Sequence, residues 1–261
     1  MAVALHADVF VPGQSTIHRW AVRSKLISLL ALMFAIAMVQ HLVLLPGAFL
    51  VVVGLYCWSG LPLAYLRRRL PYPGLFIVAM VGLLPWVSGT TVLWQWSIFA
   101  LHLEGIQMAA LIAGRFLAIL TTGFILLGTT PFLTLIKGLR SLGVSPLLSD
   151  MALLTYRYLF DIAAQLATMQ QAMRLRGYGQ MRQTLRRQWR WLAALFGSLL
   201  LRSYEQSQRI YKAMRLRGYG QSTASPYGVL EEQTHPSLLP MMVTLTAAVS
   251  LVIAEILLLA L

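Results

Sequence analysis

The nine residues AMRLRGYGQ occupy Ala172 to Gln180, and they return unchanged at Ala213 to Gln221. In both copies an Arg-Leu-Arg segment comes directly before Gly-Tyr-Gly. A glycine just past the last helical residue commonly caps a helix C-terminus, and basic residues favour the turn before it. Gly177 and Gly218 are therefore predicted to end two helices, each with an Arg-X-Arg tip.

The residues before each copy have the composition of a long helix. From Leu147 to Arg176 the chain contains neither proline nor glycine, which corresponds to roughly 45 Å of helix. Pro146 suits the first turn of that helix. A second helix is predicted from Arg182 to Arg217, where Gly197 is the only interruption.

The composition is that of a membrane protein. Of the 261 residues, 58% are hydrophobic and 11% are charged, against about 25% charged residues in soluble domains. The net charge is +13, and fourteen of the 21 Lys and Arg residues lie between Lys137 and Arg217. The single cysteine, Cys57, excludes a disulfide framework and a cysteine-based zinc site.

Five apolar stretches approach the roughly 20 residues that a helix needs to cross a bilayer. They are Leu26–Val39, Leu42–Leu66, Gly74–Trp94, Gly105–Thr129 and Leu238–Leu261. The positive-inside rule places the Lys/Arg clusters in the cytoplasm, at Arg19–Lys25, at Arg67–Arg69 and after Lys137. Five spans with the N-terminus inside satisfy all three placements.

The basic segment is predicted to lie outside the bilayer core. Its most apolar run, Trp189 to Leu201, is short and contains Arg190, which indicates an interfacial or buried helix. The predicted organisation is a cytoplasmic segment 1–24, four transmembrane helices in 25–129, a cytoplasmic or interfacial module in 130–235, and a last transmembrane helix in 236–261.

The tips allow two interpretations. Charge anchoring plus ordinary helix capping needs only basic residues and a glycine, so exact duplication argues against it. Arg174 and Arg176 are about 200° apart around a helix and cannot form one bidentate clamp, and the same holds for Arg215 and Arg217. Two identical tips indicate two equivalent partner sites, such as a homodimer or a pair of similar subunits.

Catalytic and metal-binding chemistry has little support in the sequence. The five histidines show no metal-ligand spacing; they are His6, His18, His41, His102 and His235. His102 and Glu104 fall in a predicted outer loop, and Gly177-Tyr178-Gly179 lacks the Gly-Lys-Ser/Thr ending of a phosphate loop. We therefore expect no catalytic, cofactor-binding or metal-binding residues in this chain.

Three further alternatives depend on a few residues. A permease carrying substrate through its own spans predicts ionisable residues inside them, and only Arg115 and Glu255 are found there. We expect these two to pair with each other or to face a partner helix, rather than to line a transport pathway. A membrane enzyme or lipid-binding scaffold would need a catalytic constellation, and nucleic-acid binding is disfavoured because Trp189 and Trp191 suit an interfacial helix equally well.

The paired tips resemble those of the transmembrane T component of energy-coupling factor (ECF) transporters, most closely the CbiQ-like members that serve cobalt and nickel uptake. The resemblance covers most of the chain. Besides both AMRLRGYG copies, it includes Leu127–Pro131, Lys137–Pro146 and Ala152–Tyr158. The family has an all-α polytopic fold, here with about five transmembrane helices, and a cytoplasmic coupling module of long crossed helices.

The resemblance implies a role for each tip. In the family an Ala-Arg-Gly signature ends each coupling helix, and its arginine docks in a groove on one of two ABC-type ATPase subunits. The signature carries over to Arg176-Gly177 and Arg217-Gly218, with Arg174 and Arg215 alongside. This sequence departs from the family in having Leu175 and Leu216 where alanine is frequent.

The remaining implications concern partners. The ATPases would bind ATP, and a separate CbiM-like membrane S component would bind the substrate. The chain itself would be non-catalytic and would hold no cofactor and no metal. Cobalt is the first expected substrate and nickel the second, with a vitamin as the alternative. The expected location is the cytoplasmic membrane of a bacterium or archaeon.

Overall fold

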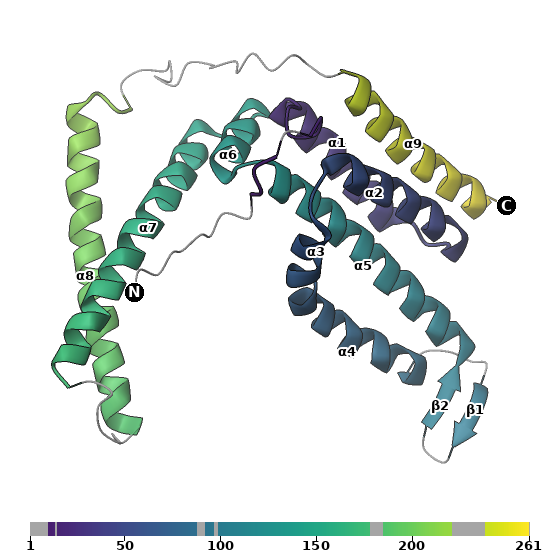
Figure 1. Ribbon diagram of the computed structural model, residues 1–261, viewed down its shortest axis with the longest axis horizontal. Helices are drawn as coiled ribbons and strands as arrows, with labels where there is room; N and C mark the ends of the chain where they lie inside the picture. Colours follow the sequence, from purple (N-terminus) through teal and green to yellow (C-terminus); the bar gives the residue numbers. More distant parts are fainter. Residues whose placement is uncertain are drawn as a thin grey trace. The chain divides into compact units, whose positions relative to one another are not determined.

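The computed structural model describes residues 10–13, 15–87, 92–96, 99–177, 185–220 and 238–260. Helices dominate these residues, which confirms the all-α polytopic membrane fold (Figure 1). In chain order the elements are α1 (Val22–Met38), the 3-10 helix η1 (Leu42–Leu44), α2 (Leu45–Ser59), α3 (Leu63–Arg69), α4 (Pro71–Val87), the strands β1 (Val92–Trp96) and β2 (Phe99–His102), α5 (Leu103–Thr129), α6 (Phe132–Ser141), α7 (Pro146–Leu175), α8 (Leu185–Leu216) and α9 (Leu238–Ala260).

Three helical stretches of the described chain are long and apolar enough to cross a membrane. They are Leu42–Ser59, Glu104–Thr129 and Met241–Leu259. The first and third predicted stretches correspond to α1 and α4, which are helices of 17 residues each. Three of the five predicted spans therefore meet the length that a crossing requires, and the total of five stays a prediction.

The second predicted span, Leu42–Leu66, is shorter than expected. The helix stops at Gly60, whose φ of +65° is left-handed and whose N–H donates to Cys57 O at 3.3 Å. Pro62 follows, and its carbonyl accepts a hydrogen bond from the Tyr56 hydroxyl at 3.1 Å. A left-handed glycine followed by proline ends a helix whatever the hydropathy around it. The residues of the predicted span from Leu63 onward belong to the separate helix α3.

The third predicted span, Gly74–Trp94, also ends early, because α4 stops at Val87. Residues 92–96 instead pair antiparallel with 99–102, and Trp96 lies opposite Phe99. A register shift falls between Val92 and Trp94. The described residues of the predicted outer loop Trp94–Glu104 thus belong to two antiparallel strands and to the start of α5, which follows β2 directly.

The chain divides into two compact units. One contains the described elements from α1 to α6 together with α9, and the other begins at Val144 and contains α7 and α8. The predicted module began earlier, at residue 130. α6 belongs with the first unit because Gly138 packs against α1: a Cβ at Gly138 would lie 2.7 Å from Val22 Cγ1 and 2.9 Å from Leu26 Cδ1.

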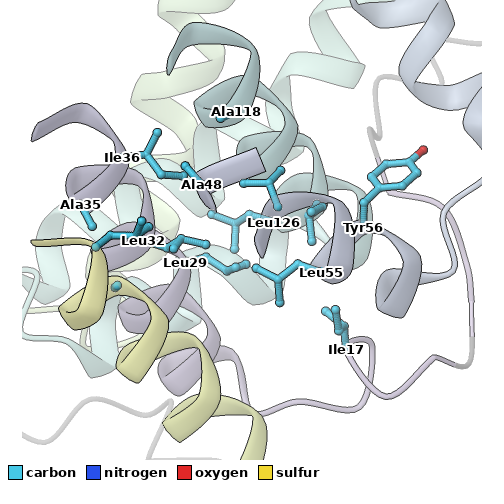
Figure 2. Packing of buried hydrophobic residues seen from close by; sticks show 14 of the residues in the cluster. Ile17, Leu29, Leu32, Ala35, Ile36, Ala48, Leu55, Tyr56, Ala118 and Leu126 are labelled. Carbon is cyan, nitrogen blue, oxygen red and sulfur yellow. The ribbon is translucent and has the colours of Figure 1, made fainter. Parts of the chain in front are cut away.

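α1 forms the centre of the first unit and contacts α5, α6 and α9 (Figure 1). Leu29 and Leu32 of α1 and Ile125 of α5 have no exposed surface. Figure 2 shows how apolar side chains from α1, α2 and α5 meet in this core. Besides Leu29 and Leu32, the labelled members are Ile17, Ala35, Ile36, Ala48, Leu55, Tyr56, Ala118 and Leu126.

Arg115 and Glu255 both attach to the C-terminal end of α1. Arg115 Nη1 donates to Ala37 O at 3.3 Å. Glu255 is buried, and its Oε1 accepts the Gln40 N–H at 2.9 Å and lies 3.8 Å from His41 Nε2. These hydrogen bonds run to the last turn of α1 and to the segment that follows it, and not from Arg115 to Glu255.

Candidate functional site

The two helices that carry the tips form as predicted. α7 has 30 residues and begins with Pro146 in its first turn. α8 has 32 residues and continues without interruption through Gly197. Its predicted start, residues 182–184, lies outside the described residues. Both helices end where the glycine pattern indicated.

The two tips have the same backbone structure. Arg176 and Arg217 each donate the backbone N–H to the carbonyls four and three residues earlier, with N···O distances of 3.2 and 3.1 Å at both tips. The following glycines, Gly177 and Gly218, have φ of +89° and +80°. Their N–H groups donate to the carbonyls three residues earlier, at 3.1 and 3.0 Å. The predicted C′ glycine caps are confirmed.

The second tip has two further hydrogen bonds. The Tyr219 N–H donates to Met214 O at 3.0 Å, which together with the glycine bond completes a Schellman motif. The Tyr219 hydroxyl donates to Asp150 Oδ2 at 3.1 Å, joining the end of α8 to the start of α7. The equivalent tyrosine of the first copy, Tyr178, lies outside the described residues.

All four arginines of the tips are exposed: Arg174, Arg176, Arg215 and Arg217. Arg215 Nη1 donates to the Tyr211 hydroxyl at 3.3 Å, and this hydrogen bond raises the pKa of Arg215 above its usual value. The guanidinium carbon also lies 5.9 Å from the Tyr211 ring centroid. The tips therefore present permanent positive charge.

The two arginines of the first tip have different surroundings, as their angular separation predicts. Arg176 lines a groove of about 470 Å³ between α7 and α8, together with Met173, Trp191, Leu195 and Arg202. Arg174 is not among the lining residues. One arginine of this pair therefore faces the neighbouring helix, while the other is directed elsewhere.

Sequence reasoning missed the exposure of the residue between each pair of arginines. Leu175 is 83% exposed and Leu216 is 89% exposed, the highest values for any large apolar side chain in the part of the chain that the structure describes. The signal available was a leucine between two arginines in a last helical turn.

α7 and α8 run in opposite directions and cross (Figure 1). At the contact, Gln165 Nε2 of α7 donates to Gln206 Oε1 of α8 at 3.1 Å. Sequence reasoning did not identify this pair either. Because the helices are antiparallel, Arg176 and Arg217 lie at opposite ends of the pair.

Among the residues that the structure describes, no group of three or more His, Cys, Asp or Glu residues could hold a metal ion. His6 and His235 lie outside the described residues. The absence of cofactors and of catalysis therefore stays a prediction.

Comparison with known proteins identifies the family. The sequence profile of the cobalt transport protein family CbiQ matches residues 13–227, which is most of the chain. The energy-coupling factor transporter transmembrane protein EcfT of Ruminiclostridium cellulolyticum is 31% identical over 128 residues, covering 47% of this chain and 46% of that protein.

Two other relatives are transport proteins of the same kind. The energy-coupling factor transporter transmembrane protein BioN of Rhizobium etli is 39% identical over 83 residues, 30% of this chain and 41% of that protein. The cobalt transport protein CbiQ of Rhodobacter capsulatus is 31% identical over 173 residues, 63% of this chain and 66% of that protein. The chain thus spans about half the length of the first relatives it matches. With its family profile matched from residue 13 to residue 227, the chain belongs to the CbiQ family of ECF transporter transmembrane components.

Proposed function

We propose that this chain is the energy-coupling transmembrane subunit of an ECF-type ABC importer. The observation that carries the proposal is the pair of exposed Arg-Leu-Arg tips with the same cap hydrogen bonds, at opposite ends of two crossed helices. Each tip would dock on one of two ABC-type ATPase subunits. Family membership supports this general role, since the relatives are named as transmembrane proteins of such transporters.

The proposed location is the cytoplasmic membrane of a bacterium or archaeon, with several spans and the N-terminus inside. Residues 1–24 would be cytoplasmic, 25–129 would contain four spans, 130–235 would contain the coupling module formed by α7 and α8, and 236–261 would form the last span. The three helical stretches that are long and apolar enough to span support a membrane location. The basic α8 supports a cytoplasmic place for the module.

The proposed division of labour leaves the chemistry to the partners. The ATPases bind and hydrolyse ATP, and a membrane S component of the CbiM-like type binds the substrate. This chain is non-catalytic and holds neither cofactor nor metal; it contacts the bilayer and no nucleic acid. Ionisable residues are scarce within the apolar stretches, where Arg115 binds the last turn of α1 and Glu255 binds the segment after it. This scarcity supports a chain that does not conduct substrate itself.

The proposed mechanism is mechanical. ATP-driven closure of the ATPases changes the distance between their docking grooves, and the two tips follow. Continuous helices of 30 and 32 residues transmit such a displacement with little loss, because their backbone hydrogen bonds resist bending. The motion then reaches the substrate-binding subunit.

Cobalt is the proposed substrate, with nickel second. The family description and the Rhodobacter capsulatus relative both carry the name cobalt transport protein. The other relatives carry no metal in their names, so a vitamin is the competing class. Uptake of radioactive cobalt and nickel by cells expressing the complete transporter decides between metal and vitamin.

The decisive experiment reverses the charge of both tips. The double variant Arg176→Glu/Arg217→Glu is expected to insert into the membrane normally but to lose co-purification of the ATPases and to lose uptake. Breaking a charge pair at an interface costs about 2–5 kcal/mol, so affinity should fall on the order of a hundredfold or more.

The matched control is Arg157→Glu/Arg209→Glu, which makes the same change in net charge at two exposed arginines in the bodies of α7 and α8. This control should keep its ATPases. If the tip variant still co-purifies with the ATPases and supports uptake, the assignment is wrong.

A further inference from the structure

The two helices are related by more than the nonapeptide. Gln165 and Gln206 are separated by the same 41 positions as the two copies of AMRLRGYGQ. They are therefore equivalent positions of one repeat, and their side chains are hydrogen-bonded to each other at 3.1 Å. A contact between a residue and its own equivalent is the mark of a two-fold relation. The axis of an internal pseudo-two-fold thus passes through this glutamine pair.

The axis makes the two tips geometrically equivalent. Eleven residues separate Gln165 from Arg176, and eleven separate Gln206 from Arg217. Both tips therefore lie about 16 Å along their helices from the axis, on opposite sides of it. A rigid surface of this kind is matched by a partner that is itself two-fold symmetric.

Each tip exposes an apolar side chain between its charges. Leu175 and Leu216 are 83% and 89% exposed, and each is flanked by two exposed arginines. Nearly full exposure of a leucine leaves about 1.5–3 kcal/mol of burial free energy unused. A partner pocket that takes this side chain would gain most of that energy.

The charges around the leucines indicate the rim of such a pocket. Over α7 and α8 the acidic residues are Asp150, Asp161 and Glu205, and Asp150 already accepts the hydrogen bond from Tyr219. The only charged residues in the tips themselves are arginines. Complementarity therefore calls for carboxylates around an apolar pocket.

The bilayer is the competing occupant for these leucines. Insertion into lipid requires only hydrophobicity and basic flanks, so Ile, Met or Phe with Lys would serve equally well. Identity at nine positions in two helices that otherwise differ is explained by two equivalent protein pockets. It is not required by a fluid membrane surface.

We propose that each tip docks by inserting its leucine, Leu175 or Leu216, into an apolar pocket rimmed by carboxylates, with one equivalent pocket on each half of a two-fold symmetric ATPase dimer. This inference rests on the proposed function and adds to it the anchoring side chain. It also adds the symmetry of the partner.

The test measures the affinity of the chain in nanodiscs for the purified ATPase dimer. The variants are Leu175→Ala, Leu216→Ala and the double substitution. Each single variant should bind about tenfold more weakly, the two to a similar degree, and the double variant about a hundredfold more weakly. Leu175→Met/Leu216→Met, which keeps the apolar volume, should bind within about threefold of the parent chain.

The matched control is Leu159→Ala/Leu200→Ala. These leucines are also related by 41 positions and are 54% and 70% exposed, but they lie away from the tips. The control should leave affinity unchanged.

The outcomes separate the two proposals. If reversing Arg176 and Arg217 abolishes binding while Leu175→Ala/Leu216→Ala does not weaken it, the function stands and the leucine anchor is wrong, with lipid as the remaining occupant. If only one leucine matters, the equivalence of the pockets is wrong. If neither the arginine nor the leucine variants affect binding, both proposals fail.

Discussion

Replacing the cap glycines by alanine isolates the backbone conformation of the tips from their side chains. At Gly177 and Gly218 a Cβ would meet no atom within 4 Å, so alanine causes no steric clash. The φ angles of +89° and +80° remain, and a left-handed conformation costs an L-residue about 1–2 kcal/mol. Both alanine variants should therefore open the cap without disturbing any packing.

Gly197 provides a control with the opposite sign. It lies within the continuous helix α8, and a Cβ there also meets nothing within 4 Å. Alanine should stabilise a helix interior by about 0.5–1 kcal/mol relative to glycine. The same chemical change is thus expected to stabilise α8 at Gly197 and to destabilise the tip at Gly218.

Hydrogen exchange measures the effect directly. In the Gly218→Ala variant, the protection of the Tyr219 amide, which donates to Met214 O, should fall about five- to thirtyfold. In the Gly218→Asn variant the protection of the Tyr219 amide should fall less, because asparagine tolerates the left-handed region. In Gly197→Ala the amides of α8 should be equally or better protected. If Tyr219 keeps its protection in Gly218→Ala, the left-handed glycine does not hold the tip, and the capping argument fails.

Two further predictions concern the first unit. Gly138→Val places atoms within the contact between α6 and α1, where a Cβ alone would approach Val22 Cγ1 to 2.7 Å. The variant should lower the free energy of unfolding by about 1–3 kcal/mol, measured as a lower midpoint of thermal unfolding in detergent. Gly54→Ala, where a Cβ would meet nothing within 4 Å, should leave the midpoint unchanged. Glu255→Leu leaves the Gln40 N–H without its acceptor and should lower the free energy of unfolding by about 1–3 kcal/mol in the same assay. Glu255→Gln keeps an acceptor oxygen and should lower it less. Equal losses of stability in the two variants would show that the carboxylate does not act through its hydrogen bond to Gln40.

The sequence was a good guide where structure depends on neighbours along the chain. The ends of α7 and α8 follow from a cap glycine behind a run of helix-forming residues, and both were predicted. The pattern at Gly60-Leu61-Pro62 is equally local. Hydropathy does not depend on backbone conformation, however, so the predicted span continued past the helix end at Gly60. The pairing of residues 92–96 with residues 99–102 was not predicted for the same reason, since an apolar strand and an apolar helix have similar hydropathy.

Other features depend on residues far apart in the sequence. The contact between Gln165 and Gln206 requires knowing how α7 and α8 pack. The hydrogen bond from the Gln40 N–H to Glu255 joins the last helix to the segment after the first helix, across more than 200 positions. Exposure of Leu175 and Leu216 likewise depends on which elements cover the tips, so the sequence could name these leucines but not show their role.

The position of the glutamine pair midway between the tips also sets a condition on avidity. Two arms of about 16 Å hold the tips at most about 33 Å apart along the helices, and stiff helices allow little variation in that span. A stiff bivalent ligand gains effective concentration at its second site only when the spacing of the sites matches its own. A partner dimer whose pockets move apart or together on nucleotide binding would therefore pass between tight two-site and weak one-site attachment, or bend the crossing angle of α7 and α8 to keep both.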